Sequence, residues 1–283
     1  MMMENVTTLT QDKLAGGYRV LTVASSVIAP RVKPGQFVHL RVPQLGESVL
    51  RRPFSVFKTE VGTLSILYKN IGLGTQAMTR LRPGDVIHLM GPLGNGFPDP
   101  DPAAYPVLVA GGYGLAALYL LAQRAPTQGI VFAGGARSAD LLCIQEFEQL
   151  GWEIRAATED GSEGDKGFVT RPLDVWLTHE LGIRTPQFFV CGPLGLLHAV
   201  AERAMIGNWT AWVSLDRHMG CGVGACLACV QKVRIRPTAD AGLTHEPSAP
   251  SPGSDAKAWK WARICTEGPV FECRDILWET NEH

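Results

Sequence analysis

Hydrophobic positions in the first third of the chain fall in short runs that polar residues and turns separate. From Tyr18 to Leu89 these runs are rich in β-branched and aromatic residues, and pairs such as Pro34-Gly35 mark turns between them. The clearest runs cover residues 18–23, 36–42 and 64–68. Many short strands at this spacing predict an antiparallel β-barrel within residues 1–100.

A different pattern begins after the proline- and aspartate-rich residues 97–102. Strands of the buried type now alternate with helical runs, which is typical of an open α/β sheet. The strands are expected at 107–110, 129–135, 153–157 and 187–190, and helices at 115–123 and 141–150. We therefore expect a nucleotide-binding α/β domain over residues 101–213, with the run 212–215 closing its sheet.

The last part, residues 214–283, contains a glycine-rich loop with three cysteines, Cys221, Cys226 and Cys229. Their C-x4-C-x2-C spacing is that of plant-type ferredoxins, in which a fourth cysteine farther along completes the [2Fe–2S] site. Glycines let such a loop turn tightly and bring its amides to the sulfurs. Cys265 is favoured as the fourth ligand because a turn follows it at once, and Cys273 is the alternative.

Three other uses of these cysteines are weaker. Zinc sites usually pair two C-x2–4-C knuckles, and this chain has one such pair plus Cys221. Disulfides need an oxidising compartment, which nothing in the sequence indicates. Inert buried cysteines rarely cluster three within nine positions. The [2Fe–2S] cluster is therefore our prediction, with a zinc-stabilised non-enzymatic adaptor as a distant alternative.

The rest of this part is a strand at 230–235, a polar insertion at Pro237–Lys257 and an ordered run at 259–264. The insertion is rich in proline and serine, which predicts a flexible or hairpin-tip segment. Trp259 and Trp261 stand in the ordered run. We expect them in the core; shielding of the cluster or contact with a partner is the alternative.

Composition narrows the function. The chain has 283 residues, which suggests two or three domains, and its 46% hydrophobic content fits a globular protein. A net charge of −1 gives no electrostatic case for nucleic acid or a membrane surface. We see no signal peptide and no apolar run long enough for a membrane helix, so the seven cysteines predict a reduced, cytoplasmic protein.

Two segments of the predicted barrel suit a dinucleotide. In Leu50-Arg51-Arg52-Pro53-Phe54-Ser55 an arginine fork beside a rigid proline suits phosphate, and the serine suits a flavin edge. Gly72-Leu73-Gly74-Thr75 opens an expected helix at 75–81 with Thr75 as its N-cap, where an anion could bind. An edge-strand arginine pair and a simple capped turn are the alternatives.

Two segments of the predicted α/β domain suit a second nucleotide. Gly111-Gly112-Tyr113-Gly114 lies between a strand and a helix, and Cys191-Gly192-Pro193 follows another strand. Ligands of open α/β sheets bind at the carboxyl ends of strands, where these segments and Arg137 are expected to meet. Tight strand–helix packing, a buried small Cys191 and a solvated Arg137 are the alternatives.

With these motifs in order, nearly the whole chain resembles the electron-transfer subunits of type B dihydroorotate dehydrogenases, a family of ferredoxin-reductase-like flavoproteins. The resemblance rests on the motifs above, on Cys265 with the following Gly268-Pro269-Val270-Phe271, and on Asp160-Gly161-Ser162 with Gly167-Phe168-Val169-Thr170. Two features depart from the family: the long insertion after Cys229, and Leu194-Gly195-Leu196-Leu197 in place of a methionine-containing run.

The resemblance implies an N-terminal antiparallel β-barrel that binds FAD, a ferredoxin-reductase-like nucleotide-binding α/β domain and a C-terminal [2Fe–2S] segment. It implies FAD at Arg52, Pro53, Phe54, Ser55, Leu67, Tyr68, Lys69, Gly74 and Thr75. It implies NAD(H) at Gly111, Gly112, Gly114, Cys191, Gly192 and Pro193, and cluster ligation by Cys221, Cys226, Cys229 and Cys265.

The activity implied is an electron relay between NAD+ and a separate FMN-containing dihydroorotate dehydrogenase catalytic subunit, in a heterotetramer of two plus two. No side chain of this chain is expected to act as an acid or base. The nearer alternative is an electron-transfer subunit of another ferredoxin-reductase-like complex, such as an NADH-dependent ferredoxin:NADP oxidoreductase or a sulfide dehydrogenase.

Overall fold

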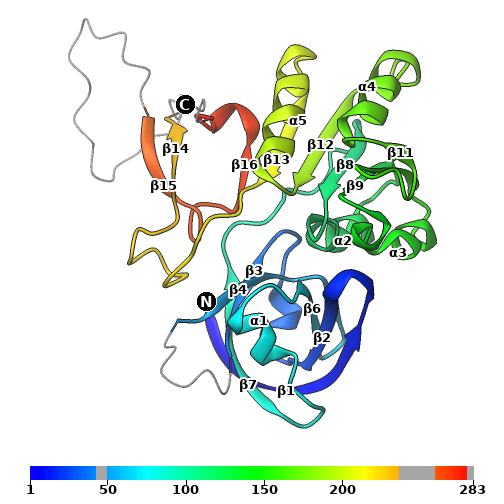
Figure 1. The fold of residues 1–283 in the computed structure, drawn as a ribbon. Coiled ribbons are helices and arrows are strands. Elements are labelled where there is room, and N and C mark those ends of the chain that lie inside the picture. Colours follow the sequence, from blue (N-terminus) through cyan, green and yellow to red (C-terminus); the bar gives the residue numbers. More distant parts are fainter. Residues whose placement is uncertain (43–49, 236–258, 279–283) are drawn as a thin grey trace, which may run out of the picture.

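The computed structural model describes residues 1–42, 50–235 and 259–278. These residues form a barrel-like sheet, an α/β unit and a two-stranded segment, which are seen separately in Figure 1. The predicted insertion at Pro237–Lys257 lies outside the described residues. The combination confirms the predicted fold class.

The first sheet has seven antiparallel strands in the order β4-β3-β7-β1-β2-β6-β5. It curves into a half-barrel around a core that includes Val6, Leu21 and Ile66. A short helix, α1 (Leu73–Met78), buries Met78 in the same core. The strands are β1 (Met2–Lys13), β2 (Tyr18–Ala24), β3 (Phe37–Arg41), β4 (Arg52–Ser55), β5 (Lys58–Glu60), β6 (Thr63–Lys69) and β7 (Val86–Leu93).

Strand β1 is the element that the hydrophobic pattern did not predict. Only Val6 and Thr8 are buried along its twelve residues, so it carries too few apolar side chains to stand out. It is held instead by backbone pairing on both edges, with β7 along Met2–Thr7 and with β2 along Thr7–Lys13. The sheet therefore begins at the first residues of the chain, before Tyr18.

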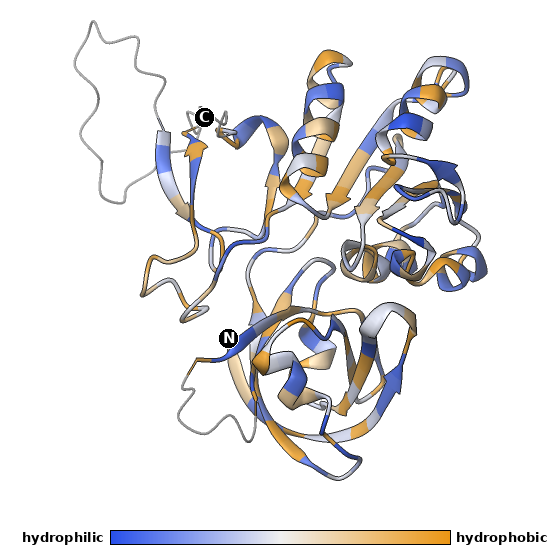
Figure 2. Cartoon of the chain, viewed as in Figure 1, coloured by the Kyte–Doolittle hydropathy of each residue, from blue (hydrophilic) through white to orange (hydrophobic). Residues whose placement is uncertain are grey.

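The second sheet has the order β11-β10-β9-β8-β12-β13-β16, and its strands are parallel except for β16. Its central strands are coloured as hydrophobic in Figure 2, as expected for a sheet covered on both faces. The strands are β8 (Tyr105–Gly111), β9 (Ile130–Gly135), β10 (Glu153–Thr158), β11 (Asp165–Lys166), β12 (Pro186–Cys191), β13 (Thr210–Ser214) and β16 (Val270–Glu272).

Helices cover both faces of this sheet. Helices α2 and α3 bury residues in a core that also contains Tyr18 and Leu67 of the half-barrel. On the other face, α4 and α5 share a core with Cys229, Cys265 and Cys273 of the C-terminal part. The helices are α2 (Gly114–Arg124), α3 (Ile144–Gln149), α4 (Thr170–His179) and α5 (Leu194–Ile206).

The edge of the second sheet corrects the prediction that the run 212–215 closes it. Strand β13 is followed by β16, which pairs antiparallel through Ser214–Val270, Val213–Phe271 and Trp212–Glu272. An isolated strand of three residues gives almost no hydrophobic pattern of its own. The pairing ties the segment after Cys265 directly to the α/β unit.

The third part is an antiparallel pair, β14 (Val230–Arg234) and β15 (Trp259–Arg263). The expected core position of Trp259 and Trp261 is wrong: their exposed fractions are 46% and 50%. Both rings lie near the ammonium of Lys232 on the adjacent strand, at 5.1 and 5.3 Å. The hydrophobic pattern could not distinguish an exposed aromatic face from a buried one.

Among the described residues, the 3-10 turns η1 (Ala15–Gly17), η2 (Ala29–Arg31) and η3 (Ser138–Asp140) lie between these elements, and η4 (Cys273–Asp275) follows β16. Within the described parts of the chain, no helix has the length and apolar character needed to cross a membrane.

Candidate functional site

The first two cysteines of the 220–229 loop lie together. The Cys221 sulfur accepts backbone N–H groups from Val223, Ala225 and Cys226 at 3.3–3.4 Å, and the Cys226 sulfur accepts the N–H of Cys221 at 3.4 Å. Burial alone would raise the pKa of the Cys221 thiol, but these donors and the Cys226 thiol lower it to about 6. The loop is therefore preorganised for a thiolate at Cys221.

The other two predicted ligands form a second pair. Cys229 and Cys265 are both buried, and their thiols are within hydrogen-bonding reach of each other. Burial first, and then Cys229, raise the pKa of Cys265 to about 12. The backbone fixes this pair, because the N–H of Ile264 donates to the carbonyl of Cys229 at 2.9 Å. The N–H of Gly224 reaches the Cys265 sulfur, which links the loop to the distant turn.

This two-by-two arrangement bears on the kind of metal site. In the described parts of the chain, no three Cys, His, Asp or Glu side chains converge as ligands of a single ion do. Two irons can each take one pair of thiolates. Cys273 is buried beside Glu272, and its thiol contacts the Glu272 carboxylate at 3.6 Å. The geometry therefore suits a two-iron group held by Cys221, Cys226, Cys229 and Cys265.

The loop also packs against the half-barrel through Gly222. Its φ is +71°, and a Cβ there would lie 2.7 Å from Cε1 of His39 on β3. Only glycine suits both conditions. The His39 side chain is fully buried, and burial together with Arg51 lowers its pKa to about 4. Sequence analysis missed His39, because a single histidine within a hydrophobic strand carries no motif.

Two of the predicted flavin segments meet in the half-barrel. The Arg52 side chain from β4 lies against Gly74, where a Cβ would be 3.1 Å from Arg52 Nε. Phe54 on the same strand is packed edge-on against Tyr68 of β6 at 6.0 Å. Pro53 lies between them on β4, while Ser55 is exposed at its end. Strand β4 thus carries an arginine at its start and a serine at its end, with two apolar residues, Pro53 and Phe54, between them.

The predicted role of Thr75 as N-cap is wrong. Helix α1 begins at Leu73 with Gly72 as N-cap, so Thr75 is the third helical residue. Its hydroxyl accepts the N–H groups of Ile71 and Gly72 at 3.0 and 3.1 Å, and these hydrogen bonds stabilise the turn that precedes α1. The sequence suggested the turn but not the register, because Gly and Thr are both common at helix starts.

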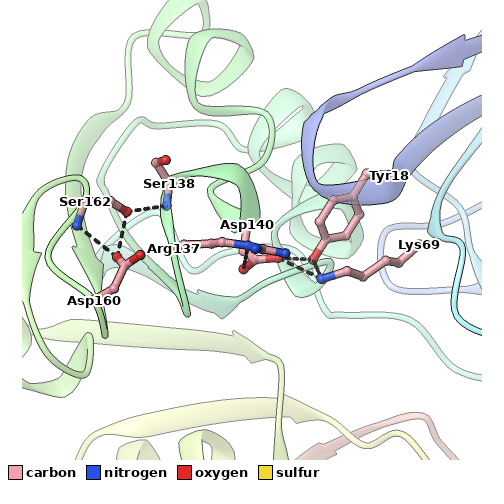
Figure 3. A network of polar contacts seen from close by, with 7 residues as sticks. All are labelled: Tyr18, Lys69, Arg137, Ser138, Asp140, Asp160 and Ser162. Atoms are coloured by element: carbon pink, nitrogen blue, oxygen red, sulfur yellow. Dashed lines mark hydrogen bonds and ion pairs between the residues drawn. The ribbon is translucent and has the colours of Figure 1, made fainter.

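The β6 residues differ in what they can offer a ligand. Leu67 and Tyr68 are buried, and burial raises the pKa of Tyr68 to about 12. Lys69 points away from the half-barrel: its ammonium donates to Asp140 Oδ1 at 2.9 Å. The Tyr18 hydroxyl donates to the same oxygen at 2.8 Å, as Figure 3 shows.

Asp140 therefore joins the half-barrel to the α/β unit. Burial would raise the pKa of its carboxyl, but hydrogen bonds from Lys69 and Tyr18 lower it below the usual value. Arg137 lies 3.8 Å from the other carboxylate oxygen. Next to it, Ser138 N–H donates to Ser162 Oγ at 2.8 Å, and Ser162 donates to Asp160 at 2.6 Å. Sequence analysis named Arg137 but not Asp140, whose partners are 71 and 122 residues away in the sequence.

The two predicted nicotinamide segments lie in contact at the carboxyl ends of β8 and β12. A Cβ on Gly114 would lie 2.1 Å from the carbonyl oxygen of Cys191, and one on Gly111 would lie 2.9 Å from Pro193. Gly112, with φ +55°, and Gly192 complete the two turns. Burial raises the pKa of the Cys191 thiol to about 12, so the thiol is protonated at neutral pH. Close packing alone requires Gly111 and Gly114.

Comparisons with known proteins bear on all three parts. A family model described as "Iron-sulfur cluster binding domain of dihydroorotate dehydrogenase B" matches residues 216–241. The chain is 34% identical over 281 residues to the dihydroorotate dehydrogenase B (NAD+) electron transfer subunit of Geobacillus thermodenitrificans, covering 97% of this chain and 98% of that protein. The subunit of the same description from Desulforamulus reducens is 34% identical over 257 residues, covering 89% of each.

Among solved structures, an NADH-dependent reduced ferredoxin-NADP oxidoreductase is similar over 97% of this chain and 90% of its own, with a TM-score of 0.77 and 25% identity. A ferredoxin NADP+ reductase of Neisseria gonorrhoeae with bound FAD and NADP matches 75% of this chain and 93% of its own. Its TM-score is 0.59 at 18% identity, which shows a shared fold.

We predict that Asp140→Asn destabilises the protein by about 1–2 kcal/mol at neutral pH, because Lys69 loses a charged partner while Tyr18 keeps an acceptor. The pKa of Asp140 is depressed, so its contribution is complete above pH 3.8 and is lost as pH falls through the folded-state pKa. The difference from wild type should therefore shrink below pH 3.8. Denaturant unfolding at several pH values measures it.

The matched control is Glu202→Gln, which removes one partner of the exposed His198–Glu202 pair and should change stability little. Equal losses in the two variants, or a loss for Asp140→Asn that does not change with pH, would contradict the assigned role of Asp140.

Proposed function

Because this chain belongs to the electron-transfer subunits of dihydroorotate dehydrogenase B, we propose that it relays electrons between NAD(H) and a separate catalytic subunit that oxidises dihydroorotate in pyrimidine biosynthesis. The observation that carries the proposal is the pairing of Cys221 with Cys226 in the 220–229 loop and of Cys229 with Cys265 across the loop and the distant turn. The work of this chain is then to hold three redox groups in a fixed order.

Cys221, Cys226, Cys229 and Cys265 are proposed to hold a [2Fe–2S] cluster, which supplies one-electron transfer when bound. The amides of Val223, Ala225 and Cys226 hold the Cys221 sulfur in place, and their dipoles favour the thiolate form. The first pair lies nearer the surface, since Cys226 is exposed, and the second pair is buried. The loop thus has an outward side and a side facing the protein interior.

FAD is proposed to bind the half-barrel, where it supplies exchange between hydride and single-electron chemistry. Arg52 lies beside Gly74, where its guanidinium donates to the carbonyl of Leu50 at 2.7 Å, and it is proposed to contact a phosphate from this position. Pro53, Phe54 and Ser55 offer an apolar strand with a terminal hydroxyl. Leu67, Tyr68 and Thr75 shape the wall and the turn of this site. Lys69 is held by Asp140, so its part is to orient the half-barrel against the α/β unit rather than to bind phosphate with a free ammonium.

NAD(H) is proposed to bind where Gly111, Gly112 and Gly114 meet Cys191, Gly192 and Pro193. The first three residues form the turn that leads from β8 into α2, and a helix N-terminus favours a pyrophosphate. The Cys191 thiol is neutral, so it can pack against a nicotinamide without a charge beside the reacting carbon. No side chain in this arrangement is assigned as a proton donor or acceptor for the transfer.

The proposed partner is an FMN-containing catalytic subunit, in a complex of two catalytic and two relay chains. A relay to ferredoxin and NADP is the second candidate, because the similar NADH-dependent reduced ferredoxin-NADP oxidoreductase covers almost the whole chain. The two candidate functions differ in the partner protein and in the final electron acceptor. One assay of acceptor reduction therefore distinguishes them.

The test is co-expression with a candidate dihydroorotate dehydrogenase catalytic subunit and purification of the complex without oxygen. We expect flavin and iron–sulfur absorbance, co-purification and dihydroorotate-dependent reduction of NAD+. A complex that contains zinc without iron or flavin would contradict the relay. Activity only with ferredoxin and NADP+ would favour the second candidate.

The choice of the fourth ligand gives a direct prediction. Cys265→Ser should lower iron and acid-labile sulfide strongly, because Cys265 lies against Cys229 and accepts the Gly224 N–H. Cys273→Ser is the matched control, a buried cysteine in the same core whose thiol contacts Glu272. It should retain the cluster. Iron loss in Cys273→Ser with a normal Cys265→Ser would reverse the assignment.

An exposed apolar face next to the cluster loop suits the catalytic subunit. It includes Trp259 and Trp261, and Leu227, which is 60% exposed with a left-handed φ of +56° between two of the cysteines. A non-glycine residue in that conformation is uncommon and tends to mark functional loops. A cavity of about 480 Å³ joins the loop to this face, lined by Leu227, Val230, Lys260, Trp261, Arg263 and Glu267.

We predict that Trp261→Ala weakens binding to the catalytic subunit by about 10-fold or more, because exposed tryptophans beside a pocket are common interface anchors. Flavin content and NADH–dye reductase activity of the relay chain should stay normal. Ile183→Ala is the control: it removes a fully exposed apolar residue in the segment between α4 and β12, and α4 lies on the opposite side of the structure from β15 in Figure 1. Unchanged binding by Trp261→Ala would exclude this face.

A further inference from the structure

His39 is a fully buried polar side chain for which the described residues provide no hydrogen-bond partner. Neither Nδ1 nor Nε2 has a partner in the described parts of the chain. Its backbone is regular, pairing with Pro53 of β4 and with Met90 of β7. Leaving a buried polar group unsatisfied is unfavourable, and a leucine or phenylalanine would fill this place in a strand without that cost.

The ring is directed at the 220–229 loop. The three atoms nearest to a Cβ on Gly222 are Cε1, Nδ1 and Nε2 of His39, at 2.7, 2.9 and 3.0 Å. The tip of the imidazole, with both nitrogens, therefore meets the loop one residue after Cys221. Phe37, two positions earlier on β3, packs beside the ring at 5.7 Å.

His39 also lies between two of the proposed redox sites. Its strand neighbour Pro53 belongs to the arginine–serine segment proposed for FAD, and its ring tip contacts the cysteine loop. An imidazole carries at least one N–H donor in either protonation state. The sulfur of Cys221 already accepts three backbone N–H groups from the loop itself.

We propose that His39 is a positioning residue for the iron–sulfur site, whose N–H donates to a sulfur atom of the [2Fe–2S] cluster on the side facing the flavin segment. The inference rests on the proposed function and deepens it. A reduced cluster carries one more negative charge than an oxidised one, so a donor to its sulfur stabilises the reduced form. His39 thereby raises the reduction potential of the cluster and favours electron flow toward it.

The experiment uses the full-length chain in its complex, loaded with flavin and cluster. The cluster potential is measured by redox titration of the electron paramagnetic resonance signal, and the flavin potential by absorbance. His39→Leu should lower the cluster potential and leave the flavin potential unchanged. His39→Gln, which keeps an N–H donor, should fall closer to wild type. Phe37→Leu is the packing control and should leave the cluster potential unmoved.

A second measurement tests the contact between His39 and the cluster directly. In wild-type protein with ¹⁵N-labelled histidine, the reduced cluster should show a weak magnetic coupling to a histidine nitrogen. His218 also lies near the loop in the sequence, three residues before Cys221, so the coupling must disappear in His39→Gln to be assigned to His39.

The outcomes are separable. A wild-type cluster without histidine coupling, or with an unchanged potential in His39→Leu, overturns the role of His39 and leaves the relay intact. A shift of the flavin potential alone also overturns it, because His39 would then serve the flavin. Wild-type protein that takes up no iron under any oxygen-free preparation overturns the proposed function itself.

Discussion

The arrangement of the site depends on how the end of the chain is tied back to the α/β sheet. Strand β16 adds antiparallel to β13, and the carbonyl of Cys229 accepts the N–H of Ile264. These backbone contacts bring Cys265 next to Cys229, although the two residues are 36 positions apart in the sequence. Without them the loop would carry three cysteines and no fourth, whatever its glycines allow.

Contacts between residues far apart in the sequence also hold the half-barrel to the α/β unit and to the cysteine turn. A relay needs its redox groups at constant separations, and rigid contacts between the units provide this. Asp140 takes two donors from the half-barrel, one of them charged, at the boundary with the α/β unit. On the other side, Asn95 at the end of the half-barrel donates its backbone N–H to Gly268, three residues after Cys265. The half-barrel is thus held by both the nucleotide unit and the cysteine turn.

The sequence predicted what local patterns encode and missed what distant contacts decide. Cysteine spacing and glycine turns are local, so the loop, the half-barrel and the α/β order were predictable. Strand β1 was missed because backbone pairing rather than apolar side chains holds it. Thr75 and the edge strand β16 were misassigned because register and pairing depend on partners far along the chain. Trp259 and Trp261 were misplaced because a hydrophobic pattern does not show whether an aromatic side chain faces the core or the solvent.

His39 and Asp140 show a further limit of sequence reasoning. Each is a polar residue at a position where the local pattern requires only a space-filling side chain. The role of each depends on a contact with another part of the structure: Gly222 for His39, and Tyr18 and Lys69 for Asp140. Gly222 is the complement of His39: its missing Cβ is the room that the imidazole tip occupies. The glycines of the loop therefore have two separate causes, since Gly224 packs against Thr266 on the cysteine turn while Gly222 admits a side chain from the half-barrel. The glycines of this motif therefore serve two different contacts, one with the cysteine turn and one with the half-barrel, and the loop lies between these two parts.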